Sequence, residues 1–196
     1  MILIKHRVNN SKELRKIDNN YGIEIDLRSK NKTIYLHHDP YKNGELFSKW
    51  IKFYNHKLLV LNVKEEGLEN QIINILKKNK INNFFFHDQT FSTILKTMNK
   101  TNVSVRFSEY EGLKKMSILF NKIKWLWIDN FTEISLDKKF YNFIKKKKVK
   151  ICIVSPELVK KKRIVEINKI VKRLKKNNFK IDAVCTKEPQ FWLKYY

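Results

Sequence analysis

Two carboxylates, Glu24 and Asp26, stand one residue apart in an apolar segment that also contains Ile23, Ile25 and Leu27. The alternation predicts a β-strand on which both carboxylates point to the same face. Adjacent carboxylates repel each other, so one of them would hold a proton unless a cation neutralises the pair. Oxygen ligands of this kind suit Mg²⁺ or Ca²⁺. Because a packed strand should not bury two carboxylates without a function, we predict a divalent-cation site here.

Histidines end two apolar runs, at His6 and at His38. Two imidazoles that face one phosphate can act as general base and general acid. Asp39 follows His38 and could hold it in one tautomer, as carboxylates beside functional histidines do. Strand alternation alone does not choose between His38 and its neighbour His37, so either could be the second proton-transfer group.

Short apolar runs recur along the chain, and each is followed by a polar or charged residue. They predict eight buried parallel strands. The runs are residues 2–4, 22–27, 58–63, 84–86, 103–107, 125–128, 151–154 and 181–185.

Helical periodicity separates several of these runs. The clearest predicted helix spans residues 156–176, with an apolar face formed by Ile164, Ile167, Val171 and Leu174. A second face contains Leu68, Ile72, Ile75 and Leu76, and a weaker one contains Leu113, Met116 and Phe120. Strand and helix in alternation indicate a parallel sheet.

Polar residues at the ends of the strands favour a closed barrel over an open sheet. In a (β/α)₈ barrel all strand ends meet at one mouth, whereas an open sheet needs functional residues only at its switch point. No glycine-rich phosphate loop follows the first run, which argues against a dinucleotide-binding sheet. We therefore predict an α/β fold, a compact (β/α)₈ TIM barrel forming one domain over residues 1–196. The strand-end residues are His6, Asp26, Lys64, Asp88, Arg106, Asp129, Ser155 and Lys187.

The predicted barrel carries one extension. Residues 33–40 form a further β-like run, separated from Asp26 by a turn at residues 30–32. The second strand should therefore return as a β-hairpin, which would bring His38 to the same mouth as Glu24 and Asp26.

The formal charge is 42 − 19 = +23. The basic residues concentrate in helical faces such as 145–148 and 160–163, so we interpret them as solvated faces and not as a nucleic-acid surface. They could still attract an anionic substrate or bind peripherally to an anionic membrane.

No apolar run has the roughly 18 residues of a membrane span. The first residues leave no room for a signal peptide, so a cytoplasmic protein is expected.

The chain contains two cysteines, Cys152 and Cys185, both within apolar runs. This placement predicts buried core thiols, with no zinc site and no structural disulfide.

Four motifs together resemble the glycerophosphodiester phosphodiesterases, of which this chain would be a short, divergent member. That family opens with His-Arg, carries Glu-x-Asp on the second strand and His-Asp about fifteen residues later, and places a Glu and a Lys on the third strand. The corresponding segments here are His6-Arg7, Glu24-Ile25-Asp26, His38-Asp39 and Asn62-Val63-Lys64. The resemblance in motifs covers the first third of the chain, and the remainder matches as barrel architecture.

The resemblance implies a metal-dependent phosphoric diester hydrolase. Glu24, Asp26 and Asn62 would be metal ligands, with Asp129 or Glu65 as a further candidate. His6 and His38 would move protons, and Lys64 would stabilise developing negative charge. Arg7 would contact the substrate phosphate, and so would Arg106. The metal would be Mg²⁺ or Ca²⁺, and the substrate a glycerophosphodiester or a related lipid head-group or glycan phosphodiester.

Two other functions compete with this hypothesis. Asn62 adds no charge where the family has a carboxylate, which favours a degenerate barrel that binds a phosphorylated ligand without turnover. The high net charge favours a basic, nucleic-acid-associated protein. Metal-dependent release of an alcohol would identify the hydrolase. Steeply salt-dependent nucleic-acid binding that survives His6→Ala would identify the third class.

Overall fold

The computed structural model describes residues 1–111, 117–132, 134–159 and 163–194. The chain forms two compact units. The N-terminal unit is Lys5–Val103, and the C-terminal unit combines Met1–Ile4 with Ser104–Tyr196. Leu113 and Met116, two members of the weaker predicted helical face, lie outside the described residues.

The sheet of the N-terminal unit has the strand order β4-β3-β2-β5-β6. Strand β2 pairs in parallel with β5, and β5 pairs in parallel with β6. Strand β5 begins with a continuous apolar run, and all six of its residues are buried, as expected of a parallel strand covered on both faces. The strands are β2 (Gly22–Lys30), β3 (Thr33–Leu36), β4 (Glu45–Leu46), β5 (Leu58–Val63) and β6 (Phe84–His87).

The predicted hairpin is confirmed. Strand β3 returns antiparallel along β2, with Leu36 opposite Leu27. The two turn residues, Asn31 and Lys32, both have positive φ angles, 50° and 63°, which is typical of the tight turns that match strand twist. Gly44 then lets the chain pass close to β3, because a Cβ atom there would lie 2.0 Å from the carbonyl oxygen of Leu36.

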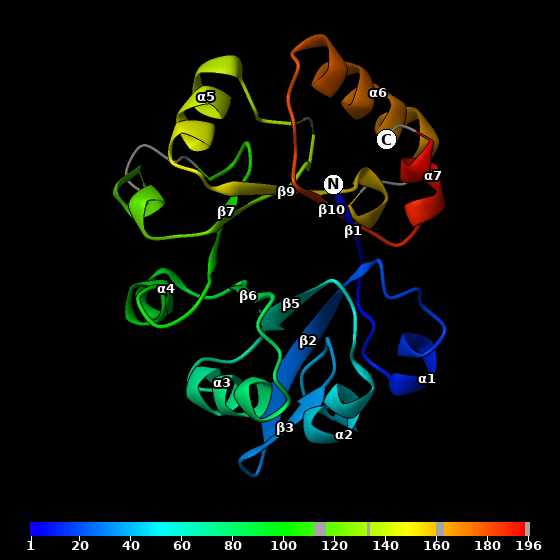
Figure 1. Cartoon of the computed structure of the whole chain (residues 1–196), viewed down its shortest axis with the longest axis vertical. Coiled ribbons are helices and arrows are strands. Elements are labelled where there is room, and N and C mark those ends of the chain that lie inside the picture. Colours follow the sequence, from blue (N-terminus) through cyan, green and yellow to red (C-terminus); the bar gives the residue numbers. More distant parts are fainter. Residues whose placement is uncertain (112–116, 133, 160–162, 195–196) are drawn as a thin grey trace. The chain divides into compact units, whose positions relative to one another are not determined.

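Short helices surround these strands (Figure 1). Strand β5 leads into α3, which buries Ile72 and Leu76 of the predicted apolar face. Asn10 caps α1, and Thr90 caps α4, each through a side-chain oxygen that accepts a backbone N–H. The helices are α1 (Ser11–Leu14), α2 (Phe47–Trp50) with the 3₁₀ turn η1 (Ile51–Phe53), α3 (Glu69–Lys78) and α4 (Phe91–Thr97).

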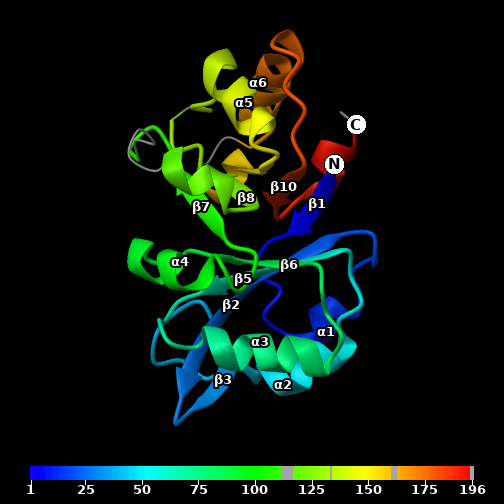
Figure 2. The ribbon, with the colours of Figure 1, turned by 60° about the vertical axis from the view of Figure 1, so that its left-hand side comes forward.

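The C-terminal unit has the strand order β1-β10-β9-β8-β7. The pairs β7–β8, β8–β9 and β9–β10 are parallel. Helices α5 and α6 lie on the same side of these strands in both views (Figures 1 and 2). The elements are β1 (Ile2–Lys5), β7 (Ser104–Phe107), η2 (Ser117–Asn121), β8 (Trp125–Ile128), α5 (Lys138–Lys146), β9 (Lys150–Val154), η3 (Pro156–Leu158), α6 (Arg163–Lys176), β10 (Ala183–Thr186) and α7 (Pro189–Leu193).

The helix predicted over residues 156–176 differs from what is observed. Residues Pro156–Leu158 form a 3₁₀ turn, η3, and among the described residues α6 is Arg163–Lys176. Glu157 accounts for the early turn, because its carboxylate accepts hydrogen bonds from the hydroxyls of Ser155 and Thr186 at the ends of β9 and β10. The Ser155 side chain therefore does not cap the helix.

Cys152 and Cys185 are both buried free thiols, as predicted. Burial raises the pKa of the Cys152 thiol well above its ordinary value, so it stays protonated and behaves as a small apolar side chain.

Candidate functional site

The two carboxylates of β2 lie buried on one face of the strand. The exposed fraction is 1% for Glu24 and 0% for Asp26. Asp26 is in register with Asn62 of the neighbouring strand β5, and the Asn62 amide donates a 3.0 Å hydrogen bond to Oε1 of Glu24. The alternation of β2 and its parallel pairing with β5 therefore bring three of the predicted oxygen ligands together.

The Glu24 carboxyl is electrostatically unfavourable in its ionised form. Burial is the largest cause that raises the pKa of Glu24 to about 7, and the negative charge of Asp26 is the second. Hydrogen bonds from the Arg7 backbone N–H and from the Asn62 side chain act in the opposite direction. A carboxyl group with this pKa is half protonated near neutral pH. A nearby cation would favour its ionised form.

His6 and Arg7 reach this carboxylate pair from the segment that follows β1. Nε2 of His6 lies 3.8 Å from Oε2 of Glu24, and the Arg7 backbone N–H donates to the same oxygen over 2.7 Å. Nε of Arg7 lies 3.8 Å from Oδ2 of Asp26. Arg7 has a φ of 57°, a strained conformation that clusters at functional sites in non-glycine residues.

Lys64 completes the group from the end of β5. Its Nζ lies 3.5 Å from Oδ1 of Asp26 and 3.2 Å from Oδ2 of Asp88. The ammonium group therefore lies beside the buried carboxylates, where it can balance negative charge that develops on a substrate.

Sequence reasoning missed Asn9 as a member of this site. Its Nδ2 donates to Oδ2 of Asp26 over 2.9 Å, and its Oδ1 accepts the backbone N–H of Asp26, also over 2.9 Å. The two bonds fix both the side chain and the backbone of Asp26. Neither strand alternation nor the four motifs predict a role for Asn9. The only sequence feature that points to the site is its position two residues after Arg7.

His38 lies just beyond β3, partly exposed, with its Nδ1 2.8 Å from Oδ1 of Asp39. The hydrogen bond from His38 is the main cause that lowers the pKa of Asp39. A carboxylate at Nδ1 holds the Nδ1–H tautomer and leaves Nε2 of the neutral ring to accept a proton. His37 differs, because its Nδ1 accepts the backbone N–H of Asp39. This difference favours His38 for proton transfer.

Arg106 and Asp129 belong to the C-terminal unit. Nη2 of Arg106 donates to Oε1 of Glu111 over 2.9 Å, and its Nε lies 3.6 Å from Oδ2 of Asp129. Asp129 also accepts a hydrogen bond from the indole N–H of Trp127. The two residues thus lie together at the ends of β7 and β8, where carboxylates already balance the guanidinium.

The donor set around Glu24 fits a hard divalent cation. Oδ1 of Asp26 and Oδ1 of Asn62 are buried oxygens without a hydrogen-bond partner in the described part of the chain. Within that same part, no group of three or more His, Cys, Asp or Glu side chains forms a ready metal cluster. Two carboxylates and an amide oxygen suit an ion such as Mg²⁺, which usually takes one or two carboxylates and completes its shell with water and substrate phosphate.

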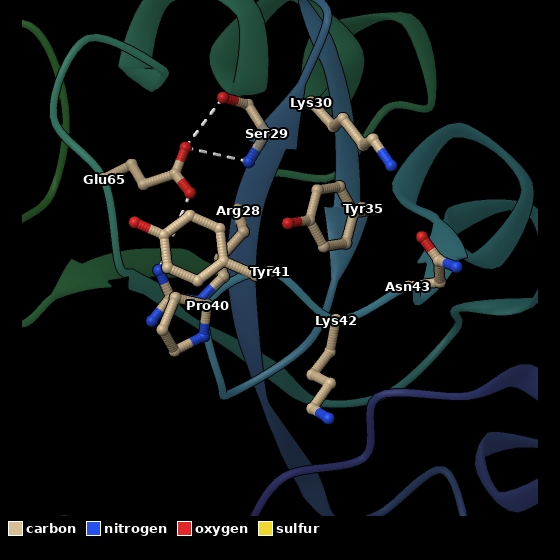
Figure 3. A pocket seen from close by; sticks show the side chains of 9 residues that line it. All are labelled: Arg28, Ser29, Lys30, Tyr35, Pro40, Tyr41, Lys42, Asn43 and Glu65. Carbon is tan, nitrogen blue, oxygen red and sulfur yellow. Dashed lines mark hydrogen bonds and ion pairs between the residues drawn. The ribbon is translucent and has the colours of Figure 1, made fainter.

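A pocket of about 430 Å³ opens along the β2–β3 hairpin (Figure 3). Arg28 and Lys30 follow Asp26 at intervals of two residues on β2, so they continue the face that carries the carboxylates. Glu65, which the sequence suggested as a further metal ligand, also lines this pocket. Its carboxylate accepts hydrogen bonds from the backbone N–H and the hydroxyl of Ser29.

Several solved structures to which this chain is similar are glycerophosphodiester phosphodiesterases. The enzyme from Thermotoga maritima aligns over 100% of this chain and 98% of its own, with 16% identity and a TM-score of 0.69. One from Agrobacterium tumefaciens aligns over 98% and 99%, with 8% identity and a TM-score of 0.67. A phosphodiesterase from Oleispira antarctica, solved with the product sn-glycerol-3-phosphate, aligns over 100% and 96%, with 14% identity and a TM-score of 0.63.

Neither a family profile nor a curated protein sequence matches the chain. The structural similarity nevertheless spans its whole length and establishes the class: an α/β protein with the (β/α)₈ barrel fold of the glycerophosphodiester phosphodiesterases. The fold implied by the sequence motifs is thereby confirmed. None of the described helices is long and apolar enough to cross a bilayer.

Proposed function

We propose that the protein is a metal-dependent phosphodiester hydrolase that acts on a glycerophosphodiester or a related phosphodiester. One observation carries the proposal: the buried pair Glu24 and Asp26 has His6 at 3.8 Å from one carboxylate and Lys64 at 3.5 Å from the other. Two paired acids, an imidazole and an ammonium group are the parts that phosphodiester hydrolysis needs, and they occur here on a barrel of the matching fold.

Glu24, Asp26 and the amide oxygen of Asn62 would hold the divalent cation. When bound, such an ion supplies Lewis-acid chemistry and neutralises charge on the phosphate oxygens. Arg7 places a guanidinium beside Asp26, and we expect this group to donate to a phosphate oxygen of the substrate. Lys64 adds a second positive charge that opposes the growing negative charge of the reacting group.

His6 and His38 would move the protons. Hydrolysis places the hydroxyl of a water molecule on phosphorus and returns a proton to the departing alkoxide, so one base and one acid are required. Asp39 holds Nδ1 of His38, which leaves Nε2 for the reacting group. The ring of His6 lies against Glu24, as that of His38 lies against Asp39, so each imidazole has a carboxylate beside it. The two histidines would share the roles of base and acid.

A panel of phosphodiesters, assayed with and without added Mg²⁺ or Ca²⁺ by ³¹P NMR, tests this function. We expect cleavage of a glycerophosphodiester to sn-glycerol 3-phosphate and a free alcohol, in agreement with the product bound in the Oleispira antarctica structure. A chelator should abolish the reaction. If no phosphodiester in the panel is cleaved under any metal condition, the hydrolase proposal is wrong.

Asn62 favours one second candidate, a barrel that binds a phosphorylated ligand without turning it over. The Asn62 amide contributes no negative charge, and its N–H group donates a hydrogen bond to Glu24. In that case sn-glycerol 3-phosphate would bind in calorimetry while the phosphodiester panel stays intact. Asn62→Glu would then be expected to create metal-dependent cleavage.

A further inference from the structure

His38 lies on a loop that has left the sheet. Strand β3 ends at Leu36, and the backbone N–H of His37 donates a hydrogen bond to the Asp26 carbonyl. Beyond that point the His38 carbonyl accepts two hydrogen bonds from one side chain, that of Arg28: Nε donates over 3.0 Å and Nη2 over 2.9 Å. A guanidinium from β2 therefore holds the backbone of the residue that we assign to proton transfer.

Arg28 is itself fixed in place. Its side chain is only 14% exposed, and its Nη1 lies 3.6 Å from Oε1 of Glu65. The other oxygen of that carboxylate accepts the backbone N–H of Ser29 over 2.9 Å and its hydroxyl over 2.7 Å. Figure 3 shows Ser29, Glu65 and Arg28 in this order along one wall of the pocket. A continuous set of contacts therefore connects Ser29 of β2, through Glu65 and Arg28, to the loop that carries His38.

The chemistry of this link requires arginine. The planar guanidinium directs two N–H groups at one carbonyl while its third nitrogen faces a carboxylate. A lysine ammonium on a flexible stem cannot occupy both places, so Arg28→Lys keeps the charge and loses the link. Displacement of a catalytic group by about 1 Å can cost a factor of about a hundred in rate.

We propose that Arg28, supported by Glu65, is a positioning residue that sets the place of the His38 ring by holding the His38 carbonyl. The proposal rests on the role of His38 in the proposed function. It gives the hairpin extension a role in the site, because the strand that carries the carboxylates also positions a proton-transfer histidine. Arg28 acts through His38 and needs no contact with the substrate.

Steady-state kinetics on the phosphodiester that the wild type cleaves fastest provide the first test. Arg28→Lys should lower kcat about tenfold and leave KM within about twofold, because it shifts a reacting group and not a binding group. Glu65→Gln retains an oxygen for Ser29 but weakens the hold on Arg28, so it should lower kcat about threefold. Arg15→Lys is the matched control, because Arg15 also donates through Nε to a backbone carbonyl, that of Ser11; its kcat should equal that of the wild type.

A second readout does not depend on activity. The ring ¹⁵N and ¹³C resonances of His38, assigned through His38→Ala, should shift in Arg28→Lys and in Glu65→Gln and stay unchanged in Arg15→Lys. If the wild type cleaves nothing, shifted His38 resonances still support the positioning link, and only the proposed function fails. Unmoved resonances overturn the inference, whether or not the rate falls. If Arg28→Lys does not fold by circular dichroism, Glu65→Gln decides by the same two readouts.

Discussion

The amide of Asn62 donates to Glu24 over 3.0 Å, and its own carbonyl oxygen stays buried without a hydrogen-bond partner among the described residues. A buried polar oxygen in this condition costs free energy unless a ligand satisfies it. In the proposed metal site, Asn62 would therefore be a neutral ligand beside the carboxyl groups of Glu24 and Asp26. It leads directly to an expected order of metal affinities.

Glu24→Gln should weaken Mg²⁺ and Ca²⁺ binding more than Asn62→Ala does. The first change removes a full negative charge from the donor set, whereas the second removes only a dipole. Titration calorimetry of the wild type and both variants measures the order, with Glu66→Gln, an exposed acid outside the site, as the control. Equal losses in the two site variants would contradict the ligand assignment.

The metal-free protein should lose stability as the pH rises from about 4.5 to about 7. Glu24 has an ordinary pKa near 4.5 and a pKa of about 7 in the folded state, so the folded state binds more protons in this window. The free energy of unfolding therefore falls with rising pH through it, and the loss is complete above the folded pKa.

Urea unfolding in the presence of a chelator, repeated across this pH window, tests that expectation. Glu24→Gln cannot titrate at this position, so the difference between the wild-type and variant curves isolates the Glu24 contribution from other groups such as His56. A difference that does not change with pH would show that Glu24 is already ionised when folded.

The first third of the chain was predictable in detail because strand alternation fixes both geometry and chemistry. The period of two places Glu24 and Asp26 on one face, and the short Asn31 turn brings β3 back along β2. Buried parallel strands are also visible as apolar runs, which is why residues 58–63 and 125–128 match the observed strands at both ends.

The remainder depends on contacts that no local pattern encodes. Asn9 and Arg28 act through side-chain bonds to residues 17 and 10 positions away in the chain. The 3₁₀ turn at Pro156–Leu158 contains Glu157, whose carboxylate accepts a hydrogen bond from Thr186, 29 residues further along the chain. Tertiary hydrogen bonds of this kind outweigh helical periodicity, and the sequence alone does not reveal them.

Lys64→Met should lower kcat about a hundredfold with little change in KM, because loss of a group that stabilises developing charge acts mainly on the transition state. Lys57→Met provides the matched control. Lys57 precedes β5 and Lys64 follows it, so the two lysines flank opposite ends of the same strand. A Lys64→Met protein with wild-type kcat would remove Lys64 from the site.

Asn9→Ala should destabilise the protein by about 1–3 kcal/mol, because it leaves the buried backbone N–H and carboxylate of Asp26 without their shared partner. Urea denaturation at fixed pH measures the change. Asn20→Ala, at an exposed position, should stay within about 0.5 kcal/mol of the wild type. Equal stabilities of the two variants would mean that the Asn9–Asp26 bonds contribute nothing net.

The most direct test compares the rate of sn-glycerol 3-phosphate release by the wild type, His38→Ala and His37→Ala at saturating Mg²⁺ or Ca²⁺, with folding checked by circular dichroism. The account predicts that His38→Ala folds normally and loses turnover, while His37→Ala retains it. A folded His38→Ala protein that releases product at the wild-type rate would contradict the assignment of two histidines and two carboxylates to one hydrolytic site.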